Sequence, residues 1–177
     1  MLIINETTKT HKSKDISIFT DGSTFNNQSK DKSKARAGVG VFFGDNDKRN
    51  MSKKLKTKKV TNQVAELMAI YYAINKALTT TDVYEKTIHI YSDSMYSINC
   101  ITTWSKSWEK NNWKKSDGTK IENKKIIKKL YYLYNNLDIK FTHVKAHKKE
   151  PSKDSEKYFK WYGNNKADYL AVSGAKS

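Results

Sequence analysis

The sequence has one cysteine, no long apolar run and only two arginines, and each shortage excludes something. Cys100 alone cannot form a disulfide within the chain or a cysteine-rich zinc site, which is typical of a reducing compartment. There is no run of about 18 apolar residues, and the N-terminal residues lack the basic-then-apolar order of a secretion signal. We therefore expect a soluble, intracellular protein without a membrane partner. No internal repeat is visible, and 177 residues suffice for one domain with a buried core.

The charge is strongly positive, with 34 lysine and arginine residues against 18 acidic ones, a formal net charge of +16 and a pI near 9.7. The excess is spread along the chain, so the folded body should attract a polyanion. A generic lysine-rich surface would have the same composition. Only Arg36 and Arg49 are arginine, and lysine binds phosphate as a point charge without the planar fork that reads base edges. The composition favours contact with a nucleic-acid backbone over reading of its sequence.

The spacing of apolar residues predicts strands at the start of the chain and then strands separated by helices. A helical pattern of apolar residues begins behind Thr61, a plausible N-cap, and a polar, basic stretch occupies residues 105–120. The expected strands are residues 15–23, 37–44, 51–57, 87–93 and 138–147, and the expected helices are residues 61–78, 94–104, 122–136 and 164 onward. An initial meander followed by alternating strands and helices predicts an α/β fold with a mixed sheet.

Four carboxylates stand in distinctive local sequences: Asp21 in IFTDGS, Glu66 in TNQVAEL, Asp93 in IYSDSMYSIN and Asp168 in GNNKADYLAV. We expect Asp21 and Asp93 to end apolar strands, where ligands gather in open α/β sheets. Glu66 should lie in the first turns of its helix, and Asp168 should begin the last helix. One aspartate at a strand end is ordinary turn chemistry, and composition alone does not prove that the four converge. If they do, their mutual repulsion requires hard cations such as Mg²⁺, and two such ions about 4 Å apart commonly serve displacement at phosphorus.

Taken together, these motifs resemble those of type-1 ribonuclease H. The resemblance runs from about Ile16 to Val172 and includes TDGS, RAGVGVFFG, TNQVAEL, YSDSMYSIN, HVKAH, GNNKAD and the tryptophans Trp104, Trp108 and Trp113. Eukaryotic-like members match best. The resemblance implies an RNase H-like fold, a five-stranded mixed sheet flanked by helices, and metal-dependent cleavage of the RNA strand of RNA/DNA hybrids that leaves 5′-phosphate and 3′-hydroxyl ends. We expect a short leader, residues 1–14, and one catalytic domain, residues 15–177, acting as a monomer.

The resemblance also implies a role for individual residues. Asp21 would bridge two Mg²⁺ ions, for which Mn²⁺ would substitute. Asp168 would join Asp21 at the ion that holds the nucleophilic water, and Glu66 and Asp93 would serve the leaving-group ion. His147 matches a mobile histidine that assists proton transfer or product release. The expected nucleic-acid contacts are Asn27, Asn62 and Gln63 on the RNA strand, Lys59, Thr61 and Asn123 on a DNA phosphate, Tyr96 and Trp104 in the DNA channel, and Lys114 and Lys115 in a basic protrusion.

Residues 148–163 depart from the compact members of that family, because this interval is longer and contains both lysines and aromatic residues. We expect Tyr158, Phe159, Trp161 and Tyr162 to pack on the protein body, because clustered rings near a helix start more often anchor a loop than stack on nucleic acid. Core packing is also the expected role of Trp108 and Trp113.

Three alternatives stay open. Another nuclease or integrase of the same superfold would share the carboxylate layout, although Asn62 and Gln63 argue against it. A non-catalytic nucleic-acid-binding module would show the same positive charge, although the presence of all four carboxylates argues against lost activity. The ribonuclease domain of a larger reverse transcriptase is a third reading, which Met1 and the short leader make less favourable.

Overall fold

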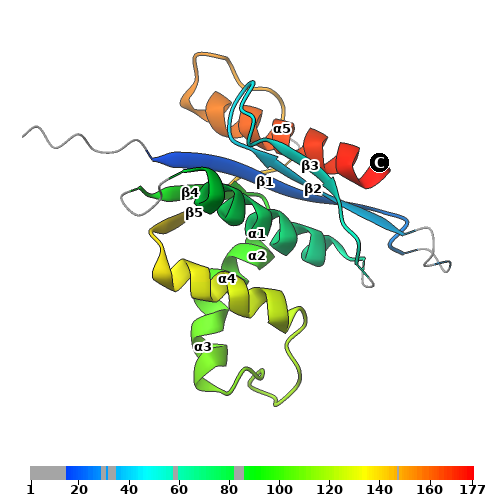
Figure 1. Ribbon diagram of the computed structural model, residues 1–177, viewed down its shortest axis with the longest axis vertical. Coiled ribbons are helices and arrows are strands. Elements are labelled where there is room, and N and C mark those ends of the chain that lie inside the picture. Colours follow the sequence, from blue (N-terminus) through cyan, green and yellow to red (C-terminus); the bar gives the residue numbers. More distant parts are fainter. Residues whose placement is uncertain (1–14, 29–30, 32–34, 58–59, 82–85, 147) are drawn as a thin grey trace, which may run out of the picture.

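The computed structural model describes residues 15–28, 31, 35–57, 60–81, 86–146 and 148–177 (Figure 1). Lys59, His147 and the leader, residues 1–14, therefore lie outside the described residues. The strands are β1 (Ile16–Phe25), β2 (Arg36–Phe42), β3 (Met51–Lys54), β4 (Ile88–Ser92) and β5 (Ile139–His143). The helices are α1 (Asn62–Thr80), α2 (Met95–Asn99), the π-helical turn η2 (Cys100–Trp104), α3 (Ser105–Lys110), α4 (Lys124–Asn136) and α5 (Glu156–Lys176).

The five strands form one mixed sheet in the order β3-β2-β1-β4-β5, which confirms the predicted α/β architecture. β1, β2 and β3 pair antiparallel, whereas β1 with β4 and β4 with β5 pair parallel. Helix α5 covers one face of the sheet, and α1 and α4 lie on the other, with α3 farthest from the strands (Figure 1). None of the described helices is long and apolar enough to cross a membrane.

The main core lies between the sheet and α1. Ile18 and Ile90 face each other across the parallel pair β1–β4, and both are fully buried. Leu67, Ile70 and Ile74 follow one another at helical spacing on α1 and are also buried against this cluster. The alternation of side chains along the strands and the helical period of α1 thus direct apolar groups into one layer, as the sequence pattern predicts.

Small residues set the distance between α5 and the sheet. Val39 and Val41 on β2 are buried on the α1 side, which leaves Gly38 and Gly40 facing α5 because successive strand residues point to opposite faces. A Cβ atom at Gly40 would collide with the carbonyl oxygen of Ala167, so the absence of a side chain permits close packing. This contact brings the middle of α5 down onto the sheet.

Several element boundaries differ from those expected. β1 continues to Phe25, because its last residues pair with β2 alone after the parallel pairing with β4 ends at Thr20. Helix α5 begins at Glu156 behind Ser155, whose hydroxyl accepts a hydrogen bond from the Lys157 amide, and not at residue 164. The helix expected over 94–104 continues through η2 and α3 to Lys110. In addition, β3 and β5 are shorter than predicted.

Of the four aromatic residues expected to pack on the protein body, Phe159 and Tyr162 contact rings of the sheet, whereas the Tyr158 and Trp161 rings contact each other. The Phe159 ring lies 5.2 Å from that of Phe19, and the Tyr162 ring lies 6.1 Å from that of Phe42. The Trp161 indole donates a hydrogen bond of 2.8 Å from Nε1 to the carbonyl oxygen of Lys148. Trp108 and Trp113 also pack against the main core. These rings fix the first turns of α5 and the segment before them.

We predict that Trp161→Ala lowers the melting temperature by an amount equivalent to roughly 1–3 kcal/mol, because it removes ring contacts and the indole hydrogen bond that hold residues 148–161 together. Tyr169→Ala is the matched control, since Tyr169 is 69% exposed on the same helix and should tolerate truncation. Thermal unfolding followed by circular dichroism measures both. Equal melting temperatures for Trp161→Ala and the unmodified protein would contradict the anchoring role.

Candidate metal centre and nucleic-acid interface

Three acidic side chains meet at the point where β4 ends. The parallel pairing of β1 with β4 ends with Thr20 opposite Ser92. The next residues, Asp21 and Asp93, therefore lie side by side just beyond the paired segments. Glu66 joins them from the first turns of α1, and one carboxylate oxygen of each residue lies within 4.8 Å of the others. Gly22 permits this approach, because a Cβ atom there would collide with the backbone of Ala65 and Glu66. The expectation that Asp21 ends its strand is wrong, because it lies within β1 at the end of the parallel pairing.

Asp168 lies at the same place. It lines a pocket of about 170 Å³ together with Asp21, Glu66 and Asp93, and its carboxyl group interacts directly with that of Asp21. Because α5 starts at Glu156, Asp168 stands in the middle of this helix and not at its beginning, which corrects the sequence-based expectation. The close packing of α5 on β2 brings the middle of the helix to the carboxylates.

Asn164 was missed by the sequence reasoning, although it belongs to the motif GNNKAD. It lies one helical turn before Asp168, so both side chains share a face of α5, and both line the pocket. Asn164 is 7% exposed, and its Oδ1 atom has no hydrogen-bond partner among the described residues. The spacing of four residues from Asp168 was the signal that could have identified it.

Burial and like charge oppose ionisation of this cluster. Desolvation, followed by the nearby charges of Asp93 and Asp168, raises the pKa of Asp21 to about 7. Desolvation, followed by the charges of Asp21 and Asp93, raises the pKa of Glu66 well above its ordinary value. The Oε2 atom of Glu66 is buried without a hydrogen-bond partner in the described part of the chain. An oxygen-only donor set with this excess of negative charge fits a hard divalent cation of the Mg²⁺ type.

The start of α1 presents the amide residues expected to contact RNA. Thr61 caps the helix by accepting a hydrogen bond of 3.2 Å from the Val64 amide. Asn62 and Gln63 follow it and are exposed, and the Asn62 side-chain oxygen accepts a hydrogen bond from the Thr24 hydroxyl. Asn62 lies one turn before Glu66, so α1 presents both on one side. Asn27 is in the turn after β1.

Aromatic residues follow the helical segment from α2 to α3. The Tyr96 and Trp104 rings lie 5.9 Å apart in an edge-to-face arrangement, and Trp104 is 38% exposed. Desolvation raises the pKa of Tyr96 to about 12, and its hydroxyl group lies close to Cys100 and Asn123. Asn123 has a left-handed backbone conformation, with φ of 58°, at the start of α4. The structure therefore groups Tyr96, Trp104 and Asn123.

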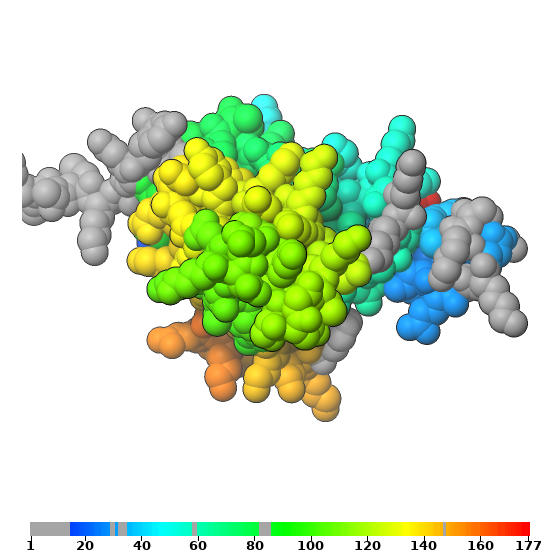
Figure 2. All heavy atoms as spheres, turned by 90° about the horizontal axis from the view of Figure 1, so that it is seen from below, coloured from blue at the N-terminus to red at the C-terminus, as the bar shows by residue number. Residues whose placement is uncertain are grey.

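Lys114 and Lys115 are exposed in the connection between α3 and α4. Lys114 lines a pocket of about 420 Å³ with Trp104 and Trp108. In Figure 2 the green and yellow-green segments that contain these residues lie nearest the viewer, and in Figure 1 they extend away from the sheet. They form an exposed basic projection, as expected.

A comparison with protein families matches residues 13–176 to RNase H. The chain belongs to the RNase H family. Ribonuclease H of Schizosaccharomyces pombe is 37% identical over 158 residues, which cover 89% of this chain and 52% of that protein. For human ribonuclease H1, the identity is 35% over 161 residues, or 91% and 50% of the two chains. A ribonuclease H of Clostridium botulinum is 31% identical over 159 residues, which cover 89% of this chain and 93% of that protein.

The chain thus spans about half the length of its eukaryotic RNase H relatives, and these relatives confirm the type-1 resemblance. Solved structures confirm the RNase H-like fold. The PFV RNase H domain superimposes with a TM-score of 0.66 at 22% identity, covering 92% of this chain and 94% of that domain. LC11-RNase H1 in complex with an RNA/DNA hybrid gives a TM-score of 0.56 at 17% identity, and the match covers 91% of this chain and 96% of that chain.

We predict that, without metal, the melting temperature of this RNase H-family protein falls as the pH rises from about 5 to about 8. The folded pKa of Asp21, about 7, lies above its unfolded value near 3.8. A carboxyl group with a raised folded pKa stabilises the fold fully at low pH, and that contribution is lost as the pH rises through the folded pKa. Mg²⁺ should restore more stability at the higher pH.

The control is Asp21→Asn, which removes the titrating group while keeping its size. It should flatten the pH dependence and reduce the effect of Mg²⁺. Parallel pH profiles for the unmodified protein and Asp21→Asn would show that the buried carboxylates do not govern stability in this range.

Proposed function

We propose that this protein is an endoribonuclease that hydrolyses the RNA strand of RNA/DNA hybrids by two-metal-ion catalysis and leaves 5′-phosphate and 3′-hydroxyl ends. The observation that carries the proposal is the convergence of Asp21, Glu66 and Asp93 in one pocket that Asp168 also lines. The relatives are named ribonucleases H, and two structural neighbours, LC11-RNase H1 and a foamy viral protease-reverse transcriptase, form complexes with RNA/DNA hybrids. The assignment of the substrate rests on the carboxylate pocket together with these relatives and neighbours.

The four carboxylates would hold the metal ions. When bound, Mg²⁺ supplies an activated water and offsets the charge that develops at the phosphate. Asp21, the most buried ligand with 6% exposure, would contact both ions, and Asp168 would assist it on the side of the attacking water. Glu66 and Asp93 would serve the side of the leaving group. His147 would transfer a proton or promote product release. We expect Mn²⁺ to replace Mg²⁺.

The surface around the pocket would bind the hybrid. Asn27, Asn62 and Gln63 would recognise the RNA strand near its 2′-hydroxyl groups, which distinguish RNA from DNA. The DNA strand would be bound by three groups of residues: Lys59, Thr61 and Asn123 at a phosphate, Tyr96 and Trp104 along the sugars, and Lys114 and Lys115 on the backbone.

Incubation with labelled RNA/DNA hybrid, duplex RNA and duplex DNA tests the proposal. With Mg²⁺ or Mn²⁺ only the RNA strand of the hybrid should be cut, whereas Ca²⁺ should support binding with little turnover because its looser coordination positions water poorly. Cleavage of duplex DNA would favour another nuclease of the same superfold. Hybrid binding without cleavage would favour a non-catalytic binding module.

We predict that Asp21→Asn lowers the cleavage rate by orders of magnitude and leaves hybrid binding largely intact, because it removes the ligand expected to contact both ions. Asp15→Asn makes the same chemical change at an exposed position outside the pocket and should retain activity. Single-turnover cleavage and binding titrations compare the two. A near-normal rate for Asp21→Asn would refute the proposed mechanism.

Replacing Lys114 and Lys115 together with alanine should raise the apparent KM and flatten the dependence of log affinity on log salt by about one unit per lost phosphate contact. The rate at saturating hybrid should stay the same, because neither residue lies in the carboxylate pocket. Kinetics at several salt concentrations separate these effects. An unchanged salt slope would mean that these lysines form only a solvated surface.

A further inference from the structure

A second basic surface lies between two described segments, residues 143–146 and 148–151, and the first turns of α5. It is a groove of about 470 Å³ lined by five lysines: Lys145, Lys148, Lys149, Lys157 and Lys160. Among the described residues no acidic side chain lines it. None of the nucleic-acid contacts proposed above includes these lysines. We call this surface the β5–α5 groove.

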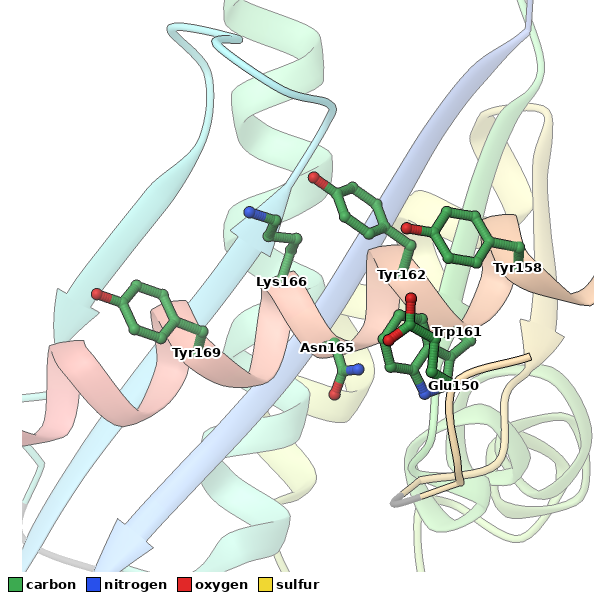
Figure 3. Close-up of a pocket in the computed structure, with 7 residues that line it drawn as sticks. All are labelled: Glu150, Tyr158, Trp161, Tyr162, Asn165, Lys166 and Tyr169. Atoms are coloured by element: carbon green, nitrogen blue, oxygen red, sulfur yellow. The ribbon is translucent and has the colours of Figure 1, made fainter. Parts of the chain in front are cut away.

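The groove has two walls that are held together. Lys157, Lys160 and Trp161 share one face of α5 because they are three and four residues apart. The other wall is the segment before the helix, and the Trp161 hydrogen bond to the Lys148 carbonyl joins the two. Figure 3 shows Trp161 beside Glu150 of that segment, and the Trp161 ring also lies 5.7 Å from the Tyr158 ring. Phe159 packs on Phe19 and fixes the helix start to the sheet.

The β5–α5 groove adjoins the carboxylate pocket. His143 lines the groove, and its Nε2 atom hydrogen-bonds the backbone carbonyl of Asp93 at 3.1 Å. Ala146 lines the carboxylate pocket, while its neighbour Lys145 lines the groove. A sugar-phosphate backbone that passes the carboxylate pocket can therefore continue directly along the lysines of the groove.

The charge of the groove defines the ligand class. None of its five ammonium groups forms an ion pair with a carboxylate in the described part of the chain. Gathering like charges around one groove is unfavourable, and a polyanion relieves that repulsion. Lysine contacts a phosphate without reading bases, so the fitting ligand is a sugar-phosphate backbone of any sequence.

We propose that the β5–α5 groove binds the backbone of the RNA/DNA hybrid beyond the carboxylates. This inference rests on the proposed function. The segment before α5 lies on the α5 side of the sheet, whereas Lys114 and Lys115 belong to the projection on the side of α1 and α4 (Figure 1). The hybrid is thus held from both sides of the carboxylate pocket, and the groove increases affinity without taking part in the chemical step.

The test is the double variant Lys157→Gln/Lys160→Gln, which removes two charges and keeps polar side chains of similar size. Its affinity for a fluorescently labelled hybrid should fall, and its log-log salt slope should decrease by about 0.9 for each lost phosphate contact. Single-turnover cleavage at saturating hybrid should match the unmodified protein. Lys48→Gln/Lys76→Gln is the control, because it removes the same charge outside the groove and should leave the slope nearly unchanged. Equal melting temperatures confirm that both variants fold.

Equal slope changes in the two double variants, or no change in either, would overturn the groove assignment. A loss confined to single-stranded RNA, with hybrid binding intact, would also overturn it. Because binding is measured without cleavage, a groove-specific loss of slope supports the inference even if no substrate is cut. Conversely, normal cleavage with an unchanged slope rejects the groove and leaves the proposed function standing.

Discussion

The repulsion among carboxylates that the fold places in one small pocket is the constraint on which the rest of the site depends. Asp21, Glu66 and Asp93 come from different elements, and burial and like charge raise the pKa of Asp21 and Glu66. Such a cluster is unfavourable as a set of bare anions and becomes favourable when a divalent cation neutralises it. Without a cation, the fold is therefore destabilised by holding these carboxylates close together.

Close approach of backbones makes this arrangement possible. Gly22 lets α1 bring Glu66 beside β1, and Gly40 lets α5 pack directly on β2, so that Asp168 reaches the same pocket. Any side chain at either glycine would collide with the backbone of the neighbouring helix. The positions of the four carboxylates are thus consequences of helix–sheet packing. The ring contact of Phe159 with Phe19 and the Trp161 hydrogen bond to the Lys148 carbonyl maintain the first part of α5 in the same arrangement.

The sequence predicted the mixed sheet and the four carboxylates because apolar periodicity and local motifs encode them directly. The sequence did not predict at which residue the pairing between two neighbouring strands ends. β1 passes beyond Asp21 because β2 continues to pair with it, and this partner is remote in the sequence. Residues 156–163 have a polar and aromatic composition that concealed the helix start at Glu156. Asn164 could have been identified from its spacing of four residues to Asp168, whereas the β5–α5 groove depends on contacts between segments that are distant in the sequence.

Binding of Mn²⁺, followed by electron paramagnetic resonance at about pH 8 with Mg²⁺ as competitor, tests the central claim most directly, because ionised carboxylates are then available as ligands. The unmodified protein should bind Mn²⁺ and release it to Mg²⁺, and Asp21→Asn should bind it much more weakly. Asp154→Asn, which changes an exposed carboxylate outside the pocket, should bind as the unmodified protein does. Equal Mn²⁺ binding by the unmodified protein and Asp21→Asn would contradict the account.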